Sequence, residues 1–268
     1  MTGTYRRYWP LVVAGFRQQS AYRLAALGGL VANVTFGLLK VSVLFATVRA
    51  SGGSVQGYDV GTMSAYVWLS QGLLGSLNLY GRTEIGERIR VGDVVVDLIR
   101  PVDVQIASIA TELGRALWAL VPRAIPTVTI GVVFVGMEMP GTFAPYALGL
   151  VSVLLGIVVS CTTVYLVATA GFWLVDNRGA EYLYMVFAGF LAGLFVPIGL
   201  FPGWLETAAH ATPFPSMMMF PIDILSGRVG GWSSVGLIGA QLAWLGITLA
   251  AGHVLTRAGR HRLEVQGG

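Results

Sequence analysis

Long apolar stretches divide this chain, and no other feature of the sequence constrains its fold as strongly. A helix that crosses the bilayer's hydrocarbon core of about 30 Å needs roughly 20 apolar residues, because each residue adds about 1.5 Å. Six segments reach that length, approximately Leu24–Val48, Val60–Tyr80, Ala116–Gly136, Ala144–Val175, Tyr182–Phe201 and Val235–Thr256. We therefore expect an all-α membrane protein with six transmembrane helices.

The composition agrees with a chain that lies mostly within lipid. Hydrophobic residues make up 55% of the chain and charged residues 11%, whereas soluble domains carry about 25% charged residues. Glycine supplies 36 of the 268 residues, and small residues allow the close backbone packing on which membrane helices depend. The single cysteine, Cys161, excludes an internal disulfide and any site built from several cysteines.

Basic residues are distributed unequally between the segments that connect the spans. One set of segments contains only Arg49 and Arg228. The other set contains Arg6, Arg7, Arg17, Arg23, Arg82, Arg88, Arg90, Arg100, Arg115, Arg123, Arg178, Arg257, Arg260 and Arg262. Short segments rich in arginine and lysine stay in the cytoplasm, and an even number of spans returns the chain to the side where it began. We expect both termini to face the cytoplasm.

Three segments outside the spans have patterns of their own within what we expect to be a single domain, residues 1–268. Residues 1–23 mix aromatic and basic side chains, which favours an amphipathic helix at the membrane–water boundary; contact with a soluble partner is the alternative. Residues 202–234 are apolar but interrupted by prolines, and irregular backbone at membrane depth must be buried in protein or line a cavity. We expect a re-entrant segment before the last helix, with an ordinary outer loop as the alternative.

The third segment, residues 81–115, is the longest hydrophilic connection. Within it, Ile85–Asp103 (IGERIRVGDVVVDLIRPVD) reads as two short amphipathic helices that Gly92 divides and Pro101 ends. A projecting helix pair suits docking into a groove on another protein, and a helix lying on the lipid surface fits the periodicity equally well. The apolar positions of the pair are Ile85, Ile89, Val91, Val94, Val95 and Leu98.

The chain carries no constellation typical of an enzyme or a metal site. A GxxxxGK[ST] phosphate loop is absent, and the histidines His210, His253 and His261 are scattered. We therefore expect a non-catalytic chain without a metal or a bound cofactor, so that an energised function would need a partner. A stand-alone secondary transporter or channel is one alternative, although such proteins usually contain inverted repeats or several buried ionisable residues. A membrane scaffold is another.

Two polar residues of the first expected span, Asn33 and Lys40, are candidates for lining a cavity. A charge at the bilayer centre costs roughly 2.5–3.5 kcal/mol on insertion scales, so such a residue needs a reason to be there. For Lys40 the alternatives are that its long stem reaches the outer interface or that it pairs structurally.

Three motifs resemble those of one protein family. Gly57-Tyr58 precedes Met63–Trp68 after the first outer loop, and the fifth span runs into Val196-Pro197, Phe201-Pro202, Pro213 and Gly227. The segment from Ile89 reads Ile-Arg-Val-Gly-Asp-Val-Val-Val-Asp-Leu-Ile-Arg-Pro101. Together they are similar to the permease subunits of ABC exporters of the ABC-2 type. The resemblance is closest to a bacterial subset whose permeases are encoded in adjacent pairs beside one ATPase gene.

The resemblance implies a half-transporter of the bacterial cytoplasmic membrane that dimerises on a pair of ABC ATPase subunits. ATP and magnesium would be bound by those subunits, and the second permease would be a related paralogue rather than an identical copy. Residues 81–115 would form the coupling loop, and residues 1–23 would form the family's connecting helix. The chain would contact membrane lipids and would bind no nucleic acid. The expected ATPase-docking residues are Arg88, Arg90, Asp93, Asp97 and Arg100, assisted by Arg82 and Glu84. The substrate would be a drug, an antibiotic, a lipid or a polysaccharide.

Overall fold

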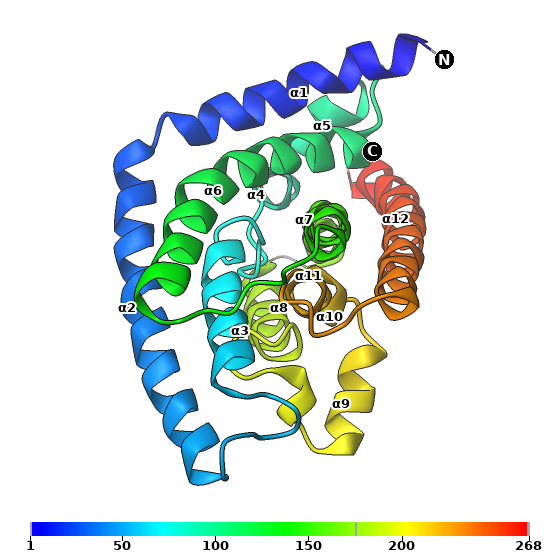
Figure 1. Ribbon diagram of the computed structural model, residues 1–268. Helices are drawn as coiled ribbons and strands as arrows, with labels where there is room; N and C mark the ends of the chain where they lie inside the picture. The colour runs from blue at the N-terminus through cyan, green and yellow to red at the C-terminus, as the bar shows by residue number, and fades with distance from the viewer. Residues whose placement is uncertain (1, 175, 267–268) are drawn as a thin grey trace.

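The computed structural model, which describes residues 2–174 and 176–266, is a bundle of α-helices (Figure 1). It is 77% helical, and its described residues contain no strand. Four helices are long and apolar enough to cross a membrane: α2 (Arg23–Ala50), α6 (Val104–Phe134), α7 (Ala144–Thr169) and α12 (Trp232–Gln266). The prediction of an all-α membrane protein is confirmed.

Two of the six expected spans are shorter in the structure. Both α3 (Val60–Leu73) and α8 (Arg178–Leu191) have 14 residues, about 21 Å at 1.5 Å per residue. After α8 the chain passes through Gly193, whose φ of +78° belongs to the left-handed region that terminates helices. The short 3-10 helix η2 (Ile198–Leu200) follows a proline. By length alone, therefore, four helices rather than six can each span the bilayer.

The remaining elements lie at the two ends of the bundle or close its interior (Figure 1). They are α1 (Thr2–Ser20), α4 (Glu84–Val91), α5 (Val94–Leu98), η1 (Ala170–Phe172), α9 (Gly203–His210), α10 (Phe214–Met217) and α11 (Met219–Leu225). The start of α1, the pair α4–α5 and the end of α12 lie together, and we call this the terminal end. The α2–α3 connection and α9 lie at the opposite, distal end.

The short helix α3 is central, and every residue from Met63 to Leu73 is buried. Its Trp68 side chain lies between Gly37 of α2 and Gly131 of α6, where an added Cβ atom would meet the indole ring. Glycine at both positions therefore lets three helices pack around one large aromatic side chain. A helix surrounded in this way is apolar on every side, which explains why its sequence reads as a span despite its length.

The segment between α8 and α12 returns into the protein interior. Residues 215–224, which make up most of α10 and α11, are all buried, and α11 packs against α7 and α3. Gln241 of α12 donates hydrogen bonds to the backbone oxygens of Ser152 and Ser216, at 2.9 and 2.8 Å. The Gln241 amide and these two backbone oxygens are thus paired within the protein, as a lipid environment requires.

The N-terminal helix α1 lies along α6. A Cβ atom added at Gly15 would collide with the Thr111 backbone, and one at Gly114 would collide with the backbone of α1. Phe16 and Trp118 meet edge to face with their ring centroids 5.3 Å apart. The expected helix within residues 1–23 is present, and part of its surface is used to pack against α6. Its place at the membrane boundary stays a prediction.

A charged cluster links two connecting segments of the chain. The Arg228 guanidinium lies 2.7 Å from the buried Asp223 carboxylate of α11 and 4.8 Å from the centre of the Tyr58 ring. The cluster therefore joins the α2–α3 connection to the segment that precedes α12.

Candidate coupling site

Local sequence signals mark both the start and the end of helix α4. The Thr83 hydroxyl accepts a hydrogen bond of 3.2 Å from the Gly86 N–H and caps the first turn. Acidic residues lie in the first turn and arginines in the last, as the helix dipole favours. Gly92 follows with a φ of +86°, so the chain reverses there before α5. The division at Gly92 that the sequence predicted is confirmed.

The apolar residues of the helix pair separate into two groups. Ile85, Ile89 and Val94 are buried against the end of α7 and η1, in one cluster with Tyr165 and Phe172. A second group points to solvent and forms what we call the apolar tip, namely Val91, Val95, Val96 and Ile99. The Ile99 side chain is 79% exposed, although isoleucine is among the residues most often buried in folded proteins. The pair is therefore anchored on one side and presents an apolar surface on the other.

An ion-pair network holds α5 to α4. The Arg88 Nε atom donates to the Asp97 carboxylate at 2.5 Å, and Arg100 lies 3.5 Å from the same carboxylate. Arg88 also reaches the backbone oxygen of Asp93 at 3.4 Å. The hydrogen bond to Asp97 raises the pKa of the Arg88 guanidinium. Arg88 and Asp97 thus brace the turn at Gly92 from within.

A second network connects this helix pair to the rest of the bundle through Arg115 of α6. Its guanidinium lies 2.5 Å from Glu84 of α4 and 2.5 Å from Glu112 of α6. The same group donates to the Gln18 side-chain oxygen of α1 at 2.7 Å. One partly buried arginine therefore ties three helices together at the terminal end, because its planar group offers five N–H donors in a fixed arrangement.

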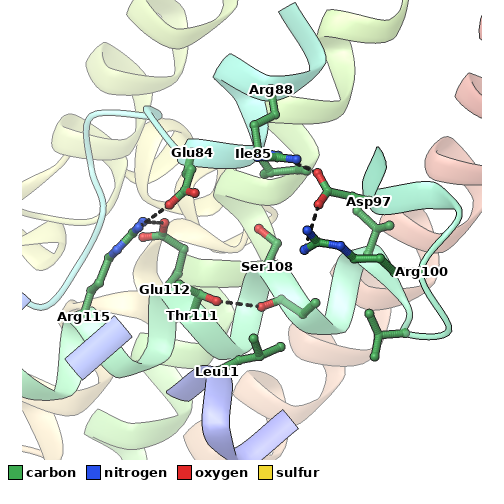
Figure 2. Close-up of a pocket in the computed structure, with 13 residues that line it drawn as sticks. Leu11, Glu84, Ile85, Arg88, Asp97, Arg100, Ser108, Thr111, Glu112 and Arg115 are labelled. Carbon is green, nitrogen blue, oxygen red and sulfur yellow. Dashed lines mark hydrogen bonds and ion pairs between the residues drawn. The ribbon is translucent and has the colours of Figure 1, made fainter. Parts of the chain in front are cut away.

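The two networks lie on either side of a pocket of about 230 Å³ (Figure 2). Figure 2 shows Glu84, Glu112 and Arg115 on one side and Arg88, Asp97 and Arg100 on the other. Leu11 of α1 and Ser108 of α6 contribute to the lining. Most of the expected docking residues are consequently engaged with the protein's own charges around this pocket.

The other expected docking residues lie on the outside of the pair. Arg90 forms a bidentate ion pair with Glu87, and its hydrogen bond lowers the pKa of the Glu87 carboxylate. Asp93 is exposed at the turn. Arg82 lies 3.6 Å from Glu181 of α8 and is largely exposed. Their role in binding a partner stays a prediction.

The two cavity candidates contact backbone oxygens of neighbouring segments. The Asn33 amide donates to the Gln71 oxygen of α3 at 2.9 Å and is buried. The Lys40 ammonium donates to the Leu194 oxygen, beyond the end of α8, at 2.5 Å and lies over the Tyr66 ring. Of the alternatives for Lys40, this geometry favours structural pairing, and a role for either residue in a transport route stays a prediction.

Sequence reasoning missed the residues that connect the site to the bundle. Arg115 counted only as one basic residue among many, and Gln18 and Glu112 were not singled out. A usable signal was present, because Glu112 and Arg115 lie three residues apart on one helix face near a membrane boundary. The exposure of Val96 and Ile99 had no such signal, since their neighbours in sequence are equally apolar.

The fold and this site define a helical membrane protein of the transporter class, with a braced helix pair at the end that holds both termini. Residues 31–267 match the family described as ABC-2 family transporter protein. The chain belongs to this family, and it is a membrane permease of ABC transporters. No curated protein matches the sequence significantly.

Proposed function

We propose that this chain is the transmembrane subunit of an ATP-driven exporter, and that separate ATPase subunits engage it through α4 and α5. The observation that carries the proposal is the apolar tip, which lies on a helix pair tied by Arg115 to both α1 and α6. An apolar helical surface fits a hydrophobic groove on a partner. Family membership supports a permease, and a permease without its own phosphate loop needs an ATPase.

The ion pairs supply a route for force. A push on the tip reaches α4, and Glu84 transmits it to Arg115 over a 2.5 Å contact. Arg115 then acts on α6, a helix of 31 residues that extends toward the distal end, and on α1. The ATPase dimer would thereby switch the permease between two conformations that bind the substrate with different affinities.

The same proposal includes the membrane arrangement. The arginine distribution supports a cytoplasmic terminal end in a bacterial inner membrane. With α3 and α8 counted as short spans, six helices cross, and the buried α10–α11 segment is the re-entrant element before α12. Two permeases, this chain and a related one, would form the pathway, with ATP and magnesium on the ATPase pair.

The proposal is tested by co-purification with the ATPase encoded beside this permease. Val95→Asp combined with Val96→Asp should lower the recovered ATPase by about tenfold or more, because two charges would be buried in an apolar groove. Val95→Leu with Val96→Leu keeps the tip apolar and serves as the matched control. Membrane insertion should be unchanged in both variants.

Three results would contradict the proposal. Recovery of the ATPase with the aspartate variant at the wild-type ratio of ATPase to permease would show that the tip does not bind the ATPase. Transport driven by an ion gradient, with no ATPase recovered from wild type, would favour a secondary transporter. Recovery of a different cargo in place of an ATPase would favour a scaffold.

A further inference from the structure

A second hollow lies between the segment before α4 and the start of α8, on a different face of α4 from the coupling site. It consists of a pocket of about 450 Å³ and a neighbouring one of about 430 Å³, and both are lined by Arg82, Glu181 and Tyr182. The first pocket is lined mostly by charged and polar residues, Arg90 and Arg178 among them. The surface of the second is mostly apolar. A polar chamber beside an apolar one has the character of an amphiphile's binding site.

The charges around the polar chamber balance. Arg82 lies 3.6 Å from Glu181, Arg178 lies 3.5 Å from Asp176, and Arg90 pairs closely with Glu87. The first two separations exceed the roughly 2.7–2.9 Å of a charge-assisted hydrogen bond. Arg82 and Arg178 therefore keep N–H donors for an anion, and Glu181 keeps acceptor capacity for a cation.

The start of α8 adds two further features. Asn177, at the N-cap of this 14-residue helix, makes no side-chain capping bond, and the Arg178 N–H donates instead to the Asp176 carboxylate at 3.0 Å. Asn177 lines the polar pocket, is 2% exposed, and has a side-chain oxygen without a hydrogen-bond partner, although its amide donates to Val167. The positive end of the helix dipole favours a phosphate nearby, and the unpartnered Asn177 oxygen favours a hydrogen-bond donor beside it.

We propose that this hollow binds one phospholipid of the leaflet at the terminal end, with a headgroup that carries both a phosphate and a primary ammonium. Arg82 and Arg178 would hold the phosphate, and Glu181 would accept hydrogen bonds from the ammonium. The glycerol backbone and the start of an acyl chain would lie in the apolar chamber against Tyr80, Tyr182 and Met185. Balanced charge makes a zwitterionic headgroup fit better than a purely anionic one.

The position agrees with a lipid rather than a soluble protein. Tyr80 and Tyr182 are 60% and 53% exposed, and exposed tyrosines beside arginines are typical of the membrane interface. The competing occupant is the ATPase, because α4 forms one wall of the hollow. The inference uses the proposed orientation but not the proposed ATPase coupling, so the two can fail separately.

The test uses the full-length permease, with any subunits that co-purify, stripped of lipid in detergent. Phosphatidylethanolamine, phosphatidylcholine and phosphatidylglycerol with identical acyl chains are added back, and bound lipid is counted by native mass spectrometry. Phosphatidylethanolamine should bind about tenfold more tightly than the other two. Only its headgroup combines a phosphate for the two arginines with an ammonium whose N–H groups can donate to Glu181. Inorganic phosphate at equal concentration should not displace it.

Three variants assign the contacts. Glu181→Gln should remove the preference for phosphatidylethanolamine over phosphatidylcholine and leave phospholipid binding otherwise intact. Arg82→Gln with Arg178→Gln should weaken all three lipids by about tenfold or more. Arg257→Gln, an exposed arginine outside the hollow, should change nothing. If the double variant does not fold, the isosteric Glu181→Gln still decides the question.

Several outcomes would overturn the proposal. Equal affinity for the three lipids, or an unchanged preference in Glu181→Gln, would exclude headgroup recognition. Displacement by inorganic phosphate would indicate a free-anion site. Labelling of Tyr182→Cys that the ATPase blocks and lipid does not block would assign the hollow to the ATPase.

Discussion

Arg88 of α4 donates a 2.5 Å hydrogen bond to the Asp97 carboxylate of α5, across the turn that Gly92 makes between the two helices. The exposed fractions of the two side chains are 31% and 17%, so water screens the contact only partly. The pair therefore maintains the angle at which the apolar tip is presented.

Reversing one charge of this pair should disrupt the brace. Asp97→Arg should loosen the α4–α5 pair, at a cost of about 1.5–3 kcal/mol for a lost hydrogen bond between charged groups. Limited proteolysis within residues 90–100 and ATPase stimulation measure the effect. The double variant Arg88→Asp with Asp97→Arg should recover much of the resistance to proteolysis and much of the ATPase stimulation.

Asp93 provides the comparison, because it is exposed and its hydrogen bond to Arg88 is made by its backbone oxygen rather than by its side chain. Asp93→Arg should leave proteolysis unchanged and reduce ATPase stimulation if Asp93 is a docking residue. Failure of the charge swap to restore stimulation, with proteolysis restored, would show that Asp97 itself contacts the ATPase.

The crossing of α1 over α6 should be sensitive to single methyl groups. Gly15→Ala places a Cβ atom against the Thr111 backbone, which cannot move as a side-chain end would. Overpacking of this kind costs roughly 1–3 kcal/mol. Gly28→Ala in α2 is the matched control, because its added Cβ atom meets nothing within 4 Å. Thermal unfolding in detergent should show a lowered midpoint for Gly15→Ala alone.

Lys40 should be important for stability more than for substrate handling. Lys40→Met keeps the length of the side chain but removes the donor to the Leu194 oxygen, which Tyr66 approaches at only 3.2 Å. We expect a loss of about 1 kcal/mol, because Tyr66 still donates to the adjacent Gly193 oxygen. An unchanged unfolding midpoint together with altered substrate preference would instead establish the cavity role.

The cap of α3 should make stability depend on acidic pH. The Thr62 backbone N–H donates to the Asp59 carboxylate at 2.8 Å, and this bond lowers the pKa of Asp59. A carboxyl group whose pKa is lower in the folded state stabilises the protein above its unfolded pKa of about 3.9. That stabilisation is lost as pH falls through the folded pKa.

The comparison of wild type with Asp59→Ala measures this effect. The variant should be about 1 kcal/mol less stable at neutral pH, as for other lost N-caps. The difference should shrink below about pH 4 as the wild-type carboxyl group becomes protonated. A difference that stays constant down to pH 3 would mean that the charged cap contributes nothing.

Local features of the chain were sufficient to predict its class and many boundaries. Apolar length predicted the four long helices, and Gly92 and Pro101 predicted where the α4–α5 pair turns and ends. These signals act within one or two helical turns, so they can be read without knowing the rest of the fold. The lengths of α3 and α8 were overestimated, because burial within the bundle makes a short helix as apolar as a span.

By itself, then, the amino-acid sequence determined a helical membrane protein with a charged helix pair near one end. Only the tertiary structure decided which residues of that helix pair are exposed and which are held by other parts of the protein. Val94 is buried and the adjacent Val95 is 50% exposed, although the two residues are identical. Asp97 and Glu84 are held by arginines from other turns or helices, Glu84 by one that lies 31 residues away. Such contacts depend on how helices cross in space, and no periodicity along the chain encodes that.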